Sequence, residues 1–177
     1  MDLEPQDVTT LDAGDTRVIA WSRVRALMTA PSPPDEPGGY FPSYLSTVRP
    51  DGRPHTTGVG VRWYNGDLYF LSGSGSRKSR DLAANPASTI AAQIAGLDIV
   101  FDGTASPTDD PATMAAVGDL IRQSGWPVEI TANGFTAPFG PSGDPTGPWQ
   151  LYRFVFDTVI AQGEAGAMRW RFTRQDA

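Results

Sequence analysis

The sequence predicts a mainly β (α+β) fold, in which an antiparallel β-barrel is flanked by helices. Two observations lead to this class. Stretches of strand length are separated by turn signals, of which Asn65-Gly66 and Pro50-Asp51-Gly52 are the clearest. Helical spacing of apolar residues is confined to a few segments that interrupt the strands. Strands joined by hairpins pair antiparallel, and closing such a sheet into a barrel covers its edges.

Composition limits the kinds of protein that this chain can be. It has 177 residues, of which 40% are hydrophobic, so we expect an N-terminal arm over residues 1–15 and a single domain over 16–177. The net charge of −6 disfavours nucleic acid as a partner. With no Cys and one His, we expect no disulfide and no metal site. The N-terminus does not resemble a signal peptide and no apolar run approaches about 18 residues, so we expect no membrane span and a cytoplasmic location.

The first half of the chain predicts one helix followed by three strands. Apolar residues recur at helical spacing from residue 15 or 16 to residue 30, and the Pro/Gly-rich segment 31–39 ends that helix. Three strands follow at 40–48, 54–64 and 67–71, because the two hairpin signals separate apolar stretches there.

The second half predicts two further helices and four further strands. A short helix ends at Asn85-Pro86, since the residue before proline avoids helical angles. A longer helix begins at Asp110-Pro111 and ends at Gly125. Residues 126–148 contain too many prolines and glycines for us to expect regular structure. The expected strands are 87–94, 97–105, 149–161 and 168–172.

The stretch from Leu71 to Pro86 carries the clearest functional signal. Two turn glycines, Gly73 and Gly75, precede a good N-cap, Ser76. The first helical turn then holds Arg77, Lys78 and Ser79. The start of a helix disfavours cations unless an anion is bound there, and Lys78 is the only lysine of the chain. These residues therefore predict a phosphate site, with a solvated basic turn as the alternative.

The two faces of the expected strand over residues 54–64 carry different side chains. Read by twos, His55, Thr57 and Val59 share one face, while Thr56 and Gly58 share the other. Two glycines, at 58 and 60, leave bare backbone on that second face, against which a flat ring system could lie; a sharp barrel corner is the alternative.

Two polar residues on the strands have a functional and a structural interpretation. His55 is the only histidine, and it is either a packing residue or a donor to a phosphate or a substrate. Gln93 ends a strand, and its amide could bond to the edge of a ring or simply be a polar residue at a strand end.

Three motifs resemble, in the same order, those of the pyridoxamine 5'-phosphate oxidase-like split β-barrels, which are also called flavin/deazaflavin oxidoreductases. The motifs are the turn Asp51-Gly52-Arg53-Pro54-His55, the basic segment with Arg77-Lys78 and Asn85-Pro86, and the closing strand Arg169-Trp170-Arg171-Phe172. The similarity covers roughly residues 18–172. It implies a homodimeric split antiparallel β-barrel that binds FMN or the deazaflavin F420 at the dimer interface.

The resemblance also implies roles for particular residues. Arg77, Lys78 and Ser79 would hold the cofactor phosphate, and Ser72 and Gly73 would lie near the ribityl chain. The ring would be lined by His55, Thr56, Thr57, Gly58 and Val59. Trp170 and Arg171 would come from the partner subunit. The implied activity is hydride transfer between F420 or FMN and a small organic substrate, without a dedicated catalytic residue; alternatives are a non-catalytic cofactor carrier and a heme protein with His55 as ligand.

Departures from the family pattern narrow the range of activities that the resemblance implies. Where pyridoxamine phosphate oxidases proper carry Arg and Lys on the second strand, this chain has Thr, Gly and Val, which argues against oxidation of vitamin B6.

Residues 134–148 would form a loop near the site, either a lid or substrate wall, or a surface loop packed on its own aromatics (Phe135, Phe139 and Trp149). Arginines 49, 53 and 62 could bind the acidic tail of F420 or be exposed charges, and on that basis we favour the deazaflavin.

Overall fold

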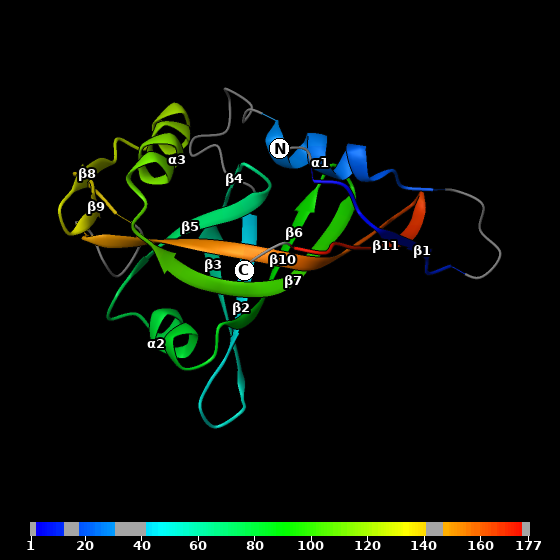
Figure 1. The fold of residues 1–177 in the computed structure, drawn as a ribbon, viewed down its shortest axis with the longest axis horizontal. Helices are drawn as coiled ribbons and strands as arrows, with labels where there is room; N and C mark the ends of the chain where they lie inside the picture. Colours follow the sequence, from blue (N-terminus) through cyan, green and yellow to red (C-terminus); the bar gives the residue numbers. More distant parts are fainter. Residues whose placement is uncertain (1–2, 13–17, 31–41, 141–146, 175–177) are drawn as a thin grey trace.

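The computed structural model describes residues 3–12, 18–30, 42–140 and 147–174, and contains three helices and eleven strands within them (Figure 1). The helices are α1 (Trp21–Thr29), α2 (Arg77–Ala84) and α3 (Pro111–Gln123). The strands are β1 (Asp7–Thr10), β2 (Pro42–Val48), β3 (Pro54–Gly60), β4 (Arg62–Tyr64), β5 (Asp67–Gly73), β6 (Ala87–Ile94), β7 (Leu97–Thr108), β8 (Glu129–Thr131), β9 (Gly134–Thr136), β10 (Trp149–Gly163) and β11 (Gly166–Arg171). No helix in the described ranges has both the length and the apolar character needed to cross a bilayer.

The long strand β10 organises the sheet. It pairs with β7 along almost its whole length. Its other edge is shared: the first half, Trp149–Phe154, pairs with β5, and the second half, Thr158–Gly163, pairs with β11. From β7 the sheet continues through β6 and β2 to β3, and every pairing is antiparallel. The mainly β, antiparallel fold predicted from the sequence is therefore confirmed, and β10 crosses the point where its two partners separate.

A β-bulge in β10 marks that point. The register with β7 shifts between Phe156 and Thr158, so that Asp157 is the extra residue. Gly103 of β7 lies opposite, and a Cβ atom there would overlap the carbonyl oxygen of Val155. The bend in β10 thus requires a residue without a side chain on the neighbouring strand.

Two hydrophobic clusters fill the molecule. The larger lies inside the barrel and is closed by α1, whose Trp21 ring packs against the rings of Trp63, Phe156, Trp170 and Phe172. The smaller lies beneath α3 and the β8–β9 hairpin, at the end of the molecule where these elements gather in Figure 1. Its buried members are Tyr69, Val117, Ile121, Val128, Phe135, Ala137, Trp149 and Leu151.

Several predicted boundaries were wrong. The first helix begins at Trp21, after extended backbone at Ala20, and the expected start at residue 15 or 16 lies outside the described residues. The expected strand over 54–64 is two strands, because the chain leaves β2 after Gly60 and pairs with β5 from Arg62. The strand expected over 97–105 continues to Thr108.

Segment 126–148 contains a hairpin where no regular structure was expected. Strands β8 and β9 pair there, and Gly134 adopts a positive φ of 118° that suits glycine. The Thr131 hydroxyl donates to the Gly134 carbonyl across the turn (3.0 Å). In addition, residues 7–10 of the expected N-terminal arm form β1, which pairs with β11. The expected loop at 31–39 lies outside the described residues.

Candidate functional site

A cluster of serine hydroxyls fixes the turn from β5 into α2. The Ser76 side chain caps the helix by accepting a hydrogen bond from the Ser79 amide (3.3 Å). The Ser72 hydroxyl lies 3.0 Å from that of Ser76 and 2.7 Å from that of Ser79, and both Ser72 and Ser79 are buried. The predicted cap at Ser76 is thus confirmed, and the three hydroxyls hold the start of the helix in a defined place.

The first turn of α2 carries two cations at the protein surface. Arg77 is exposed and Lys78 is half-buried, and the first turn holds no acidic residue. The Ser79 side chain, by contrast, is occupied by the serine cluster. Because backbone N–H groups and the positive end of the helix dipole also meet here, the geometry suits an anion.

Strand β3 lies next to α2 and forms one edge of the sheet. Within the described residues, β3 pairs with β2 alone. A Cβ atom added at Gly58 would meet nothing within 4 Å, so the backbone there is open to a ligand or another chain. The change of partner strand at Val61 shows that a barrel corner also follows Gly60. The open backbone expected for a ligand is therefore supported at Gly58, and the barrel corner is supported at Gly60.

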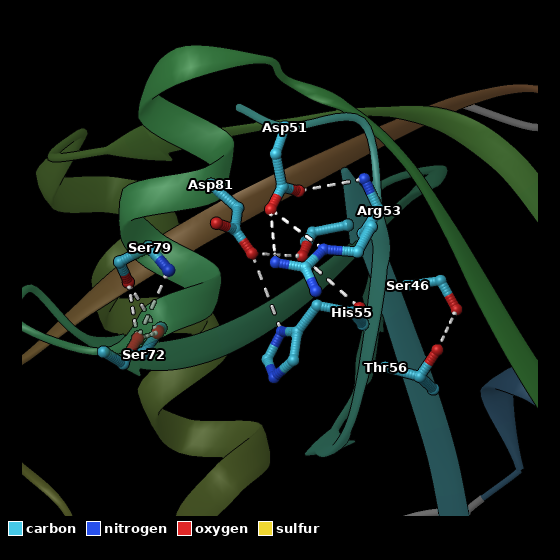
Figure 2. A network of polar contacts seen from close by, with 10 residues as sticks. Ser46, Asp51, Arg53, His55, Thr56, Ser72, Ser79 and Asp81 are labelled. Atoms are coloured by element: carbon cyan, nitrogen blue, oxygen red, sulfur yellow. Dashed lines mark hydrogen bonds and ion pairs between the residues drawn. The ribbon is translucent and has the colours of Figure 1, made fainter. Parts of the chain in front are cut away.

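On its other face, β3 contacts α2 through His55 and Asp81 (Figure 2). The Asp81 side chain is only 3% exposed and accepts a hydrogen bond from the Thr47 hydroxyl of β2 (3.0 Å). His55 Nδ1 lies 3.7 Å from the same carboxylate oxygen and is buried without a hydrogen-bond partner. At the tip of the β2–β3 turn, Arg53 pairs with Asp51 and its hydrogen bonds lower the pKa of that carboxyl.

The sheet register places several predicted residues on the outer face. Tyr44 of β2 lies opposite Gly58. A second row of partners on the same face runs across the sheet from β3 to β11. That row consists of Thr56, Ser46, Thr89, Asp102, Thr158 and Arg171. Gln93, the last residue but one of β6, lies on the same face and donates to Asp98 (2.8 Å). Thr56, Gly58, Gln93 and Arg171 thus share the outer face, with Thr56 and Arg171 at opposite ends of their row.

Other predicted residues are covered by their own chain. Trp170 is 1% exposed and packs against Trp21 in the main core. Val59 is buried and Thr57 half-buried on the inner face of β3. Gly73, at the end of β5, is half-buried opposite Trp149. Trp170 therefore serves the core in this structure and is not at a surface that a second subunit's ligand could reach.

The three arginines expected to form one group are divided. Arg49 and Arg53 flank the β2–β3 turn, where the Arg49 amide donates to the Arg53 carbonyl (3.0 Å). Arg62 instead donates to the Ser124 hydroxyl beside α3 (2.6 Å). A long acidic ligand near α2 could meet Arg49 and Arg53, but Arg62 serves a different contact.

Sequence reasoning missed Asp81 and Thr47. A signal was present, because Asp81 follows Arg77 by four residues and Lys78 by three, which places it on the same face of a short helix. The pairing of that face with His55 depends on tertiary structure. No group of three or more potential metal ligands occurs among residues 3–12, 18–30, 42–140 and 147–174.

The segment expected as a lid or substrate wall lies beside the turn into α2. Trp149 pairs with Gly73 on one side and with Phe135 on the other. Phe135 and Trp149 are buried in the smaller core, whereas Phe139 is 57% exposed and its carbonyl accepts from the Trp126 indole (2.8 Å). Residues 141–146 lie outside the described part, so the choice between a lid and a surface loop stays a prediction.

Comparisons with known proteins agree with the fold and with the family that the sequence resembles. The sequence family described as pyridoxamine 5'-phosphate oxidase matches residues 42–157. A conserved hypothetical protein of Mycobacterium tuberculosis has a similar structure, with a TM-score of 0.60 at 16% identity over 87% of this chain and 90% of that one. A pyridoxamine 5'-phosphate oxidase-related, FMN-binding protein of Nostoc punctiforme matches with a TM-score of 0.50 at 23% identity over 76% and 81%. A protein described as an F420 reductase matches with a TM-score of 0.51 at 19% identity over 76% and 94%. Among curated proteins, no sequence matches significantly.

Proposed function

Because this chain belongs to the pyridoxamine 5'-phosphate oxidase family, we propose that it binds FMN or F420 and uses the reduced cofactor to reduce a small organic substrate. The observation that carries the proposal is the start of α2. Two cations, Arg77 and Lys78, stand there on a turn held by buried serines, beside an open strand edge. Cations and backbone N–H groups at a helix start, with no acidic residue in the first turn, suit a phosphate-bearing ligand.

The residues around that turn fit such a cofactor. Arg77, Lys78 and the free amides of α2 would bind the phosphate, and the serine cluster would keep those donors in place rather than bind the phosphate itself. The half-buried Gly73 and the buried Ser72 would adjoin the ribityl chain. The ring would lie along β3 at Gly58, where an added Cβ atom would meet nothing within 4 Å.

We propose further that the outer sheet face is covered by a second copy of the chain. Its central row consists of Gly58, Tyr44, Ala91, Val100, Ile160 and Arg169. The Tyr44 ring is 55% exposed, and a large exposed aromatic beside small and aliphatic side chains is typical of an interface. Arg171 and Gln93 lie on that face, so in a dimer they would approach the partner's cofactor, a role for which the buried Trp170 is not placed.

The bound cofactor would supply the hydride, so the protein's part is to bind and orient the two reactants. The proposed phosphate contacts fix one end of the cofactor, and the proposed second copy would cover the sheet face from water. The alternative function is a cofactor carrier. Such a protein would bind the cofactor along β3 but leave no face of it open to a substrate.

Of the two cofactors, we favour F420. Arg49, at the β2–β3 turn, could bind its acidic tail, and Arg53 could do so by exchanging its partner Asp51 for the ligand, whereas Arg62 is engaged with Ser124 on a different part of the fold. The similarity to an FMN-binding protein and to an F420 reductase is compatible with either cofactor.

The test is a parallel fluorescence titration of the purified protein with FMN and with F420. Tight binding of one cofactor would support the proposal, and turnover of a substrate panel with its reduced form would separate an enzyme from a carrier. If neither cofactor binds, the proposal is wrong and the basic turn serves another anion.

A further inference from the structure

The half-buried His55 and the buried Asp81 face each other across the contact between β3 and α2. The His55 side chain is 22% exposed, yet its Nδ1 atom is fully covered and has no hydrogen-bond partner. Asp81 Oδ2, 3.7 Å away, accepts from Thr47. That separation is too long for a hydrogen bond but short enough for a small ring movement to form one.

The pair determines where the imidazole carries its proton. A carboxylate accepts hydrogen bonds and cannot donate one, and a neutral imidazole carries a single N–H. If Nδ1 were bare, two lone pairs would face each other away from water, which costs free energy. This argument favours the N–H on Nδ1 and the lone pair on Nε2. Figure 2 shows that Nε2 lies on the side of the ring away from Asp81.

The free side of the ring belongs to the same region as the two cations of α2. Asp81 follows Arg77 and Lys78 by one helical turn, so the three share a helix face, and helical side chains lean toward the N-terminus. Figure 2 draws the His55 ring and the Ser72–Ser79 cluster, which holds the start of the helix, on the same side of Asp81. A phosphate bound by the first turn of α2 would thus come near Nε2.

We propose that Asp81 is a positioning residue that prepares His55 to bind the cofactor's phosphate as an imidazolium ion. Nδ1–H donates to Asp81, while Nε2 takes one proton from water as the phosphate binds and then donates to a phosphate oxygen. Because the ring gains this proton only when the phosphate is present, cofactor binding is coupled to the uptake of a proton. The inference rests on the proposed function. It adds His55 Nε2 as a hydrogen-bond donor to the phosphate and adds the uptake of one proton to the binding reaction.

The charges around His55 are consistent with this coupling. The charged groups on the neighbouring elements are Arg49 at the end of β2, Asp51 and Arg53 in the β2–β3 turn, and Arg77, Lys78, Arg80 and Asp81 on α2. Asp51 and Arg53 neutralise each other at the exposed tip of the turn. Among the described residues, the ion-pair partner of His55 is Asp81, so the carboxylate offsets the charge that the ring gains.

The orientation by Asp81 can be tested without any cofactor. Because His55 is the only histidine, the ¹⁵N spectrum of its ring reports one residue, provided that the protein carries no histidine tag. At pH 8.5 we expect the Nδ1–H tautomer in the wild type and a gain of the Nε2–H tautomer in Asp81→Asn. Asp102→Asn is the matched control, since Asp102 also accepts from a threonine hydroxyl but lies on β7 (2.9 Å). Because an asparagine oxygen could still accept from Nδ1–H, Asp81→Ala is measured as well, and an unchanged tautomer in both variants would refute the role of Asp81.

The proton uptake is tested by calorimetry at pH 8 in two buffers with different ionisation enthalpies. We expect close to one proton taken up with FMN or F420, none with the phosphate-free riboflavin, and none in His55→Gln, which should also bind about tenfold more weakly. Cofactor binding without proton uptake would refute this inference and leave the proposed function intact. Absence of cofactor binding, with the Nδ1–H tautomer present, would refute the proposed function and the phosphate contact while retaining the orientation by Asp81.

Discussion

Removing the two cations at the start of α2 should weaken binding of a phosphate-bearing cofactor and leave the fold intact. The perturbation is Arg77→Ala combined with Lys78→Ala. Neither side chain is buried, and the serine hydroxyls that hold the turn are untouched by the change. The double variant therefore removes charge from the site without removing the structure that presents it.

The magnitude follows from the exposure of the two side chains. A hydrogen bond to a charged group contributes about 1.5 to 3 kcal/mol, and the lower value applies to side chains that solvent reaches. Two such bonds give about 3 kcal/mol, which corresponds to a loss of affinity of about 150-fold. Stability should change by less than about 0.5 kcal/mol, because surface substitutions have small effects and cations at a helix start are unfavourable.

The assay is fluorescence titration of the wild type and variants with the cofactor and with its phosphate-free counterpart. Arg80→Ala is the control, because Arg80 is exposed on the same helix beyond its first turn. The reasoning would be refuted by a loss below about fivefold in the double variant, or by an equal loss for the phosphate-free compound.

Three further predictions concern the framework of the site. Gly103→Ala should destabilise the protein by about 2–3 kcal/mol in urea unfolding, because the new Cβ overlaps the Val155 carbonyl, whereas Gly58→Ala should leave stability unchanged and weaken cofactor binding or dimer formation. Asp110→Ala should lower Tm at pH 7 and Asp110→Asn should not. The helix-start hydrogen bonds lower the pKa of this carboxyl, so its stabilisation is present above the ordinary value near 4 and is lost as pH falls through the lowered one; a Tm difference that persists at pH 2 would contradict this. Asp67→Asn should cost about 3 kcal/mol, measured by urea unfolding, because a buried carboxylate is removed from two arginine pairs, and an unchanged midpoint would show that those pairs contribute nothing.

The parts of the site that could be predicted from the sequence depend on local interactions. The glycine turn, the cap at Ser76 and the stop at Asn85-Pro86 involve residues within one or two turns of one another, so the chain specifies them before tertiary contacts form. The contact of Asp81 with His55 joins residues 26 positions apart in sequence, and no local pattern indicates it.

Trp170 and the β8–β9 hairpin show two other limits. Arg169, Trp170 and Arg171 alternate in a strand, and alternation fixes that the tryptophan and the arginines take opposite faces. It does not say which face meets the core, and the family resemblance alone suggested a ligand contact for a side chain that the core buries. In segment 126–148, the number of prolines and glycines concealed two three-residue strands. They are stabilised by pairing, of β9 with β10 and of β8 with β9, rather than by their own propensity.

The shared strand β10 also has a consequence for synthesis of the protein. It pairs Leu151 with Leu71, 80 positions earlier, and continues to partners on both of its edges, so β5 and β7 leave the ribosome long before the strand that joins them. Until then both strands expose unpaired backbone and apolar faces, which are sites of intermolecular association. Closure of the barrel must follow the release of nearly the whole chain, and contacts between such distant residues form slowly. A nascent chain arrested before Trp149 should therefore depend on chaperones, whereas one extended through Arg171 should fold on its own.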